Sequence, residues 1–166
     1  SRAGVDCEAM PPRDWAIGVG TGFEGNLGDF VRDPDEPIPV TFGDVVDTSD
    51  SSEFGILSGD HIMVRLGCEM PDVTACAFLL GDVDGLMDKP PGELDSTLLR
   101  TWSSEQGFSG SHDLDHDVTG GILLKAGCAS EIARCVEQVW LLNGAVPRRV
   151  LGVVSHGDVV GTRILH

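Results

Sequence analysis

The chain contains 166 residues, a length that suits one ordinary domain of 17.6 kDa. Its 27 acidic residues outnumber the 11 Lys and Arg residues and give a formal net charge of −16. Binding to nucleic acid through phosphates needs clustered cations, and the longest basic run here is Arg148-Arg149. The composition therefore argues against nucleic acid and anionic membranes as partners.

Membrane insertion is also disfavoured, because the sequence has no run of 18 apolar residues. At 41% hydrophobic residues, the chain still has enough apolar material for a packed core. The five cysteines lack C-x-x-C spacing, which argues against a zinc module and suits thiols in a reducing compartment. We expect a soluble globular protein of the cytoplasm.

Short apolar runs separated by glycine predict strands and turns over the first hundred residues. Residues 15–19 are predicted to form a strand that leads into a glycine-rich loop, 20–28. The stretch Gly20-Thr21-Gly22-Phe23-Glu24-Gly25 fits the G-x-G-x-x-G pattern of dinucleotide sites. The helix that such a site needs is missing, since prolines follow at 34, 37 and 39. A glycine-rich turn is therefore favoured over a dinucleotide site.

Further strands are predicted between this loop and residue 80. Residues 39–42 and 44–46 fit short edge strands. In residues 61–66 the alternation places Ile62, Val64 and Leu66 on one face, which predicts another strand. The unbroken apolar run over 73–80 is typical of a central strand that is buried on both faces.

The final third of the chain predicts a strand-helix-strand unit. Residues 121–124 and 150–154 fit buried strands, and Ser130 can cap a helix that ends before Gly144. Apolar residues recur at helical spacing along this helix, at Ile132, Val136, Val139 and Trp140. We therefore expect residues 1–166 to form a single globular domain of mixed α/β or α+β class. It should be strand-rich, with one principal helix near residues 130–143.

A run of histidines and aspartates before this unit is the first candidate site. Five potential metal ligands occur within six residues, namely His112, Asp113, Asp115, His116 and Asp117. Imidazoles and carboxylates together suit Zn²⁺, Mn²⁺ or Fe²⁺, and carboxylates alone suit Ca²⁺ or Mg²⁺. The run predicts a site for a divalent metal ion, and a solvated polar loop is the alternative interpretation.

The second candidate site follows the last predicted strand. Ser155, His156 and Asp158 come directly after residues 150–154, and α/β sheets place their sites in loops beyond the carboxyl ends of strands. His156 and Asp158 are therefore predicted to be catalytic residues, with a histidine held in a turn as the alternative.

Two functional hypotheses follow from these sites. The first is a small enzyme, a hydrolase or lyase, that uses a divalent metal ion and His/Asp acid–base chemistry on a small polar substrate. The second is a non-catalytic subunit that serves the assembly of an oligomer or shell. Both hypotheses allow a homo-oligomer. They differ in whether His156 and the 112–117 run share one site.

Overall fold

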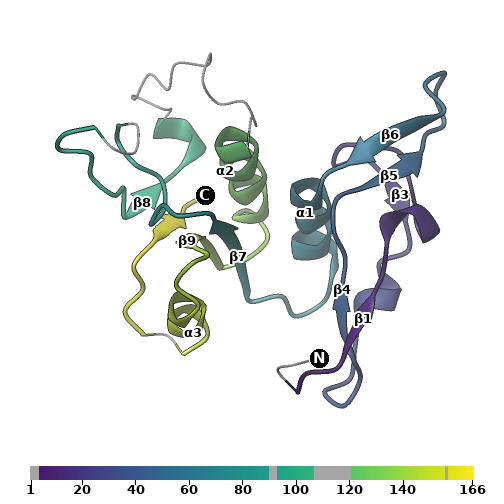
Figure 1. Cartoon of the computed structure of the whole chain (residues 1–166), viewed down its shortest axis with the longest axis horizontal. Coiled ribbons are helices and arrows are strands. Elements are labelled where there is room, and N and C mark those ends of the chain that lie inside the picture. Colours follow the sequence, from purple (N-terminus) through teal and green to yellow (C-terminus); the bar gives the residue numbers. More distant parts are fainter. Residues whose placement is uncertain (1–3, 90–92, 107–120, 156) are drawn as a thin grey trace. The chain divides into compact units, whose positions relative to one another are not determined.

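A computed structural model describes residues 4–89, 93–106, 121–155 and 157–166 (Figure 1). Strands and helices are mixed along the chain, so the predicted mixed α/β class is confirmed. The chain divides into two compact units, Ser1–Pro71 and Asp72–His166. The single globular domain over 1–166 stays a prediction.

The first unit is built from three pairs of short strands, two 3-10 turns and one α-helix. β1 pairs with β4 in parallel, whereas the pairs β2 with β3 and β5 with β6 are antiparallel. In chain order the elements are β1 (Cys7–Ala9), η1 (Pro12–Asp14), β2 (Ala16–Ile17), β3 (Glu24–Gly25), η2 (Gly28–Phe30), β4 (Ile38–Val40), β5 (Asp44–Asp47), β6 (Phe54–Leu57) and α1 (Gly59–Glu69).

An aromatic cluster forms the core of the first unit. Trp15 makes edge-to-face contacts with Phe23 and Phe30, with ring centroids 5.8 and 5.0 Å apart. Leu57 and Ile62 pack in the same buried cluster, from the end of β6 and from α1. This core joins segments from most of the unit, which compensates for strands too short to be stable in isolation.

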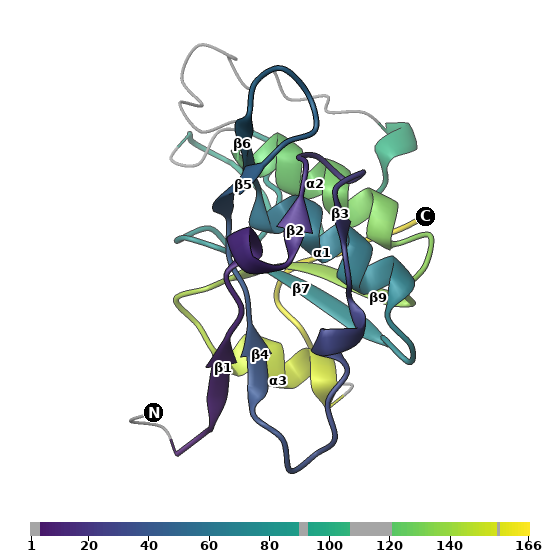
Figure 2. The same ribbon diagram turned by 90° about the vertical axis from the view of Figure 1, so that its right-hand side faces the viewer.

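The second unit contains one four-stranded sheet with the order β7-β9-β10-β8. β7 and β9 are parallel, β10 is antiparallel to β9, and β8 is parallel to β10. Helices α2 and α3 lie on opposite faces of this sheet (Figures 1 and 2). The elements are β7 (Ala75–Leu80), β8 (Thr101–Trp102), η3 (Ser104–Gln106), α2 (Gly121–Ile132), β9 (Gln138–Asn143), α3 (Arg148–Val154) and β10 (Thr162–Ile164).

The predicted strand-helix-strand unit is wrong, because the structure has helix, strand and helix in that order. Residues 121–124 begin α2, residues 138–143 form β9, and residues 150–154 belong to α3. Ile132, Val136 and Val139 are all buried, as predicted. Ile132 is the last residue of α2, whereas Val139 lies in β9. The helical spacing of these buried residues therefore does not come from one helix.

The continuous run of Val139 to Leu142 explains this error. A strand of a parallel sheet is buried on both faces and carries apolar residues without alternation, so periodicity alone cannot distinguish it from a buried helix. β9 is such a strand, since it pairs with β7 in parallel over six residues and lies between α2 and α3.

Other local predictions have mixed outcomes. Residues 61–66 lie in α1, not in a strand, because Ser58 caps the helix by accepting a hydrogen bond from the Asp60 backbone amide. Ile62 and Leu66 are four residues apart and pack against the same core. The strands predicted near 39–42, 44–46 and 73–80 are confirmed as β4, β5 and β7. The central, doubly buried position predicted for 73–80 is wrong, because β7 lies at the edge of its sheet and Leu79 is 51% exposed. The glycine-rich segment is a turn that joins the antiparallel strands β2 and β3.

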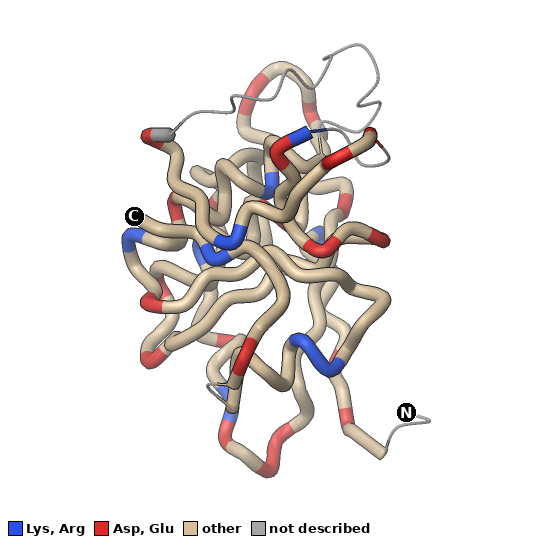
Figure 3. Tube along the Cα trace, turned by 90° about the vertical axis from the view of Figure 1, so that its left-hand side faces the viewer, with Lys and Arg blue, Asp and Glu red and all other residues tan. Residues whose placement is uncertain are grey.

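Acidic residues are spread along the trace of both units (Figure 3). Several of them bind arginines within their own unit. Examples are the ion pairs Arg13–Asp44 and Arg65–Glu69 in the first unit and Arg149–Asp84 in the second. The described residues contain no helix with the length and apolarity that crossing a bilayer requires.

Candidate functional site

The carboxyl ends of the parallel strands β7 and β9 lie side by side in the second unit's sheet. We call this end of the two strands the carboxyl edge of the sheet. Leu80 and Asn143, the last residues of the two strands, are partners in the register. The Gly144 amide donates a 2.7 Å hydrogen bond to the Leu80 carbonyl oxygen. A Cβ atom at position 144 would lie 2.7 Å from that same oxygen, so only glycine fits there. Open α/β sheets bind their ligands at such strand ends.

Four polar residues gather at this edge, and we call Asp82, Asp84, Asn143 and Arg149 the strand-end cluster. The Asn143 side-chain amide donates to the Asp82 carbonyl oxygen at 3.2 Å and to Asp84 Oδ1 at 3.0 Å. Arg149 Nη1, from the first turn of α3, lies 2.6 Å from the same Asp84 oxygen. The cluster thus joins the loops that follow β7 and β9 to helix α3.

The two carboxylates of the cluster have different environments. Hydrogen bonds from Arg149 and then Asn143 lower the pKa of Asp84 below its ordinary value, so this group is ionised at neutral pH. Asp82 is exposed, and its carboxylate makes no hydrogen bond or ion pair within the described ranges. One carboxylate is therefore held in place, and the other can accept a ligand.

An apolar hollow of about 370 Å³ lies beside the cluster. It is lined by Leu79 of β7, by Asn143 and Gly144 at the end of β9, and by Pro147, Val150 and Leu151 at the start of α3. Charged side chains and an apolar hollow therefore lie side by side at the carboxyl end of the sheet, and Asn143 belongs to both.

The donor chemistry of the cluster suits a hard cation such as Mg²⁺. That ion typically binds one or two carboxylates and completes its shell with water and substrate phosphates. The residues described contain no group of three or more His, Cys, Asp or Glu side chains that could enclose a metal ion. An ion at this edge would therefore need ligands beyond the protein's own carboxylates.

Most of the predicted site residues lie outside the described residues. This holds for the predicted metal ligands His112, Asp113, Asp115, His116 and Asp117, and for the predicted catalytic residue His156. Asp158 is described and is 93% exposed, with one oxygen 3.9 Å from Nη2 of Arg100. Their assignment as metal ligands or catalytic residues stays a prediction.

The strand-end cluster did not emerge as a site from the sequence. Acid pairs such as Asp82 and Asp84 are expected by chance in a chain with 27 acidic residues, so the pair by itself indicates only a solvated surface. The sequence feature that could have identified them is their position directly after the unbroken apolar run that forms β7. Asn143 and Arg149 could not be recognised, because residues 130–154 were assigned to the wrong elements.

Two sets of curated relatives match the sequence, although no family model does. The chain is 33% identical over 135 residues to the isopentenyl phosphate kinase of Methanothermobacter thermautotrophicus, a match that covers 76% of the chain and 48% of that protein. It is 35% identical over 108 residues to the glutamate 5-kinase of Streptococcus agalactiae serotype III, covering 59% of the chain and 39% of that protein. The chain thus spans about half the length of the curated relatives it matches.

Solved structures that are similar in fold are also isopentenyl phosphate kinases. A crystal structure of an isopentenyl phosphate kinase substrate complex matches 98% of the chain and 61% of its own length, with a TM-score of 0.72 and 26% identity. The product complex of the isopentenyl phosphate kinase of T. acidophilum matches with the same values.

These similarities overturn both functional hypotheses drawn from the sequence. The matched proteins are kinases, which are phosphotransferases, so the predicted metal-dependent hydrolase or lyase is wrong, and so is the assembly subunit. The His/Asp run and the loop after residue 154 carry general acid–base and ligand chemistry, which does not by itself distinguish a hydrolase or lyase from a phosphotransferase. A bound metal ion, a homo-oligomer and a cytoplasmic location stay predictions. The mixed α/β fold of the chain is consistent with the amino acid kinase fold.

Proposed function

We propose that the chain is part of a phosphotransferase that moves the γ-phosphoryl group of a nucleoside triphosphate to a small acceptor. The observation that carries this proposal is that the sequence comparison and the fold comparison both find isopentenyl phosphate kinases, and the fold match covers 98% of the chain. Because the chain spans about half of those relatives, the proposal concerns the contribution that its own residues make.

The strand-end cluster is the proposed site for the nucleotide's phosphates and their cation. Enzymes of this class depend on positioning and charge neutralisation, and a bound Mg²⁺ would supply positive charge against the phosphates. The exposed carboxylate of Asp82 would supply a protein ligand for that ion. Asn143 holds the Asp82 carbonyl and the Asp84 carboxylate, so its role would be to fix the loop that presents Asp82.

Arg149 contributes positive charge at the same edge. Its side chain is only 15% exposed and binds Asp84. This pairing restrains the guanidinium near the strand ends, where it would face the phosphates of a bound nucleotide. Neutralising an acidic edge in this way favours an anionic ligand in a chain of net charge −16.

The acceptor is proposed to be isopentenyl phosphate, whose terminal phosphate oxygen would take up the phosphoryl group to give a diphosphate and the nucleoside diphosphate. Three of the matched structures and the first curated relative carry this name. Glutamate is the second candidate acceptor, supported by the match to glutamate 5-kinase.

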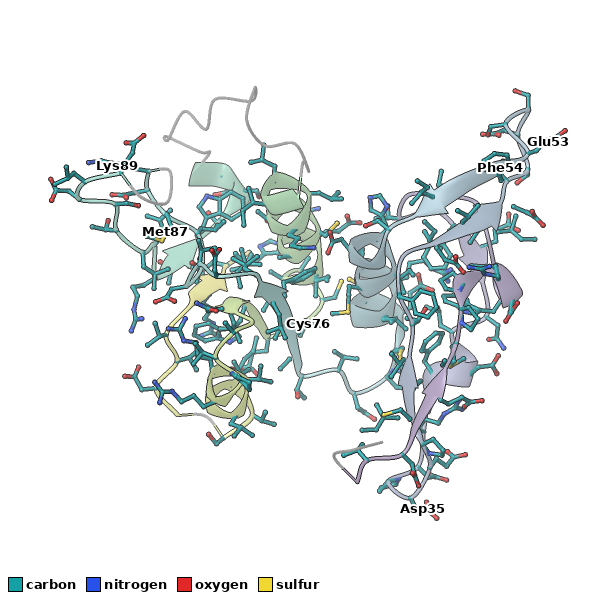
Figure 4. The ribbon with its side chains drawn as sticks, in the orientation of Figure 1. Asp35, Glu53, Phe54, Cys76, Met87 and Lys89 are labelled. Carbon is teal, nitrogen blue, oxygen red and sulfur yellow. The ribbon has the colours of Figure 1, made fainter. Side chains whose placement is uncertain are left out.

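The test is a calorimetric titration of the intact chain with ATP in the presence and absence of Mg²⁺. We expect magnesium-dependent binding that weakens about tenfold in Asp82→Asn. Asp35→Asn is the matched control, since it removes one exposed carboxylate from the loop before β4 (Figure 4). Absence of nucleotide binding by the folded wild-type chain would overturn the proposal.

The acceptor is tested separately by phosphoryl transfer. The chain, joined to the part of the Methanothermobacter kinase outside the match, is incubated with ATP and either isopentenyl phosphate or glutamate. We expect diphosphate formation from isopentenyl phosphate. Product from glutamate alone would replace the proposed acceptor while leaving the nucleotide site intact.

A further inference from the structure

A buried hydroxyl group lies in the sheet of the second unit, where its neighbours are apolar. Thr162 is the first residue of β10, pairs with Leu141 of β9, and is 0% exposed. Ile164, the next residue on the same side of the strand, is also buried. A buried hydroxyl group costs free energy unless it is hydrogen-bonded, so the partners of Thr162 explain why it is there.

This hydroxyl group both accepts and donates. Thr162 Oγ1 accepts a 2.8 Å hydrogen bond from the Leu86 amide and donates a 2.6 Å hydrogen bond to the Leu99 carbonyl oxygen. The Leu99 amide in turn donates to the Leu86 carbonyl oxygen at 2.8 Å. Valine has nearly the same shape as threonine but can neither accept nor donate. The hydroxyl group therefore joins β10 to two segments that are distant in the sequence.

The two leucines lie at the base of an antiparallel arm, which we define as residues 86–88 and 97–99. Backbone pairing joins its two sides, and Figure 4 labels Met87 on it. A second polar tie lies further along the arm, where the hydroxyl and the amide of Thr97 both donate to the Asp88 carboxylate at 2.7 Å. The arm is thus held at two places, and only the tie at its base involves Thr162.

The base of the arm is also the end of the loop that carries the strand-end cluster. Residues 81–85 connect β7 to Leu86. The loop is fixed at its start by the pairing of β7 with β9, and the Asn143 side chain binds the carbonyl oxygen of Asp82. At its end the Thr162 hydroxyl group holds the Leu86 amide. The Asp82 carboxylate is therefore presented by a backbone that is fixed on both sides.

This end of the loop is tightly packed. A Cβ atom at Gly85 would lie 2.8 Å from the Thr162 backbone nitrogen, and Leu86 is 2% exposed. Removing the hydroxyl group would leave a buried amide and the Leu99 carbonyl oxygen each without this hydrogen bond. Buried backbone groups of this kind need other partners, so the loop would have to shift to provide them.

We propose that Thr162 is a positioning residue for the nucleotide site. Its hydroxyl group fixes the end of loop 81–85 and so holds the Asp82 carboxylate in place at the carboxyl edge. The inference rests on the proposed kinase function, which assigns Asp82 to the cation that accompanies the phosphates. Thr162 does not touch the ligand, because its effect passes through the Leu86 amide and the loop backbone.

The test is a double-mutant cycle on ATP binding, measured by calorimetric titration of the intact chain in the presence and absence of Mg²⁺. We expect Thr162→Val to weaken magnesium-dependent binding about tenfold. Thr162→Ser keeps the hydroxyl group and should bind within about twofold of the wild type. Since Thr162 acts through Asp82, adding Thr162→Val to Asp82→Asn should cause little further loss.

Thr97→Val is the matched control, because it removes a threonine hydroxyl group from the same arm without affecting the Leu86 amide. It should leave magnesium-dependent binding unchanged. Thermal melts establish that each variant is folded at the temperature of the titration. If Thr162→Val does not fold, Thr162→Cys takes its place in the cycle, since a thiol is a weak hydrogen-bonding group.

Four results would each overturn the inference and leave the nucleotide site intact. These are unchanged binding in the folded variant that lacks the hydroxyl group, equal weakening in Thr162→Ser, equal weakening in Thr97→Val, and losses that add fully in the cycle with Asp82→Asn. Absence of ATP binding by the folded wild-type chain is a different result, because it would overturn the proposed function together with the inference.

Discussion

The two units use the same kind of ion pair for different purposes. In the first unit, Arg13 makes a two-pronged contact with Asp44, which is 8% exposed and lies at the start of β5. In the second unit, Arg149 binds Asp84 at the open carboxyl end of the sheet, and the carboxylate remains 43% exposed. The first pair ties a 3-10 turn to a hairpin, whereas the second arranges charge where a ligand can reach it.

The units also differ in how they obtain a core. The first packs short strand pairs around Trp15, Phe23 and Phe30, so its stability depends on a side-chain cluster. The second buries a longer sheet between two helices, so its stability depends on the layers. Exposed apolar side chains occur in each unit, at Phe54 (Figure 4) and Ile56 of β6 in the first and at Leu151 and Val154 of α3 in the second.

The largest effect is expected from placing a charge in the core of the second unit. Val136 is 3% exposed, so Val136→Asp would bury an unpaired carboxylate and destabilise the protein by roughly 3–5 kcal/mol. Chemical denaturation measures this loss, with Leu94→Asp as an exposed control in the same unit.

The same variant tests whether the chain is a single domain. The indole resonances of Trp15 report on the first unit and those of Trp140 on the second. We expect both to lose their dispersion in one transition. Retention of the Trp15 signals after those of Trp140 have collapsed would show that the units unfold independently.

A smaller effect is expected where the loop after β7 approaches β10. A Cβ atom at Gly85 would lie 2.8 Å from the Thr162 backbone nitrogen. Thr162 Oγ1 also accepts a hydrogen bond from the Leu86 amide, so the backbone cannot move away without breaking it. Gly85→Ala should therefore cost about 1–3 kcal/mol in unfolding experiments. Gly81→Ala, where a Cβ meets nothing within 4 Å, is the matched control.

The Arg13–Asp44 pair should make the first unit sensitive to acid. The hydrogen bond from Arg13 lowers the pKa of Asp44 below its ordinary value of 3.8. The stabilisation from Asp44 is thus complete above that value and is lost as pH falls through the lower pKa of the folded state. Chemical denaturation at a series of pH values measures this effect. The free energy of unfolding of the wild type should exceed that of Asp44→Asn at neutral pH, and the two values should converge below about pH 4. Parallel curves would contradict this role.

The smallest effect is expected at the surface pair of α1. Glu69 is 49% exposed and binds Arg65 four residues earlier, so Glu69→Gln should cost about 0.5 kcal/mol or less. Arg65→Gln should cost more, because Arg65 also donates to the Phe23 carbonyl oxygen and lies over the Phe23 ring. Equal losses in the two variants would show that only the ion pair matters.

The sequence by itself determined the mixed α/β class and the presence of strand β7, although not its position at the edge of the sheet. It also determined the glycine-rich turn between β2 and β3, because φ freedom and the following prolines are local properties. Those features depend on residues that are close together in the chain.

Only the tertiary structure decided the identity of α1, α2, β9 and α3. The apolar runs in these segments fit more than one period, and burial against a distant partner selects between helix and strand. The strand-end cluster was undetermined for the same reason. Asp84 and Asn143 are 59 residues apart, and they meet only because β7 and β9 pair in parallel and end at the same edge.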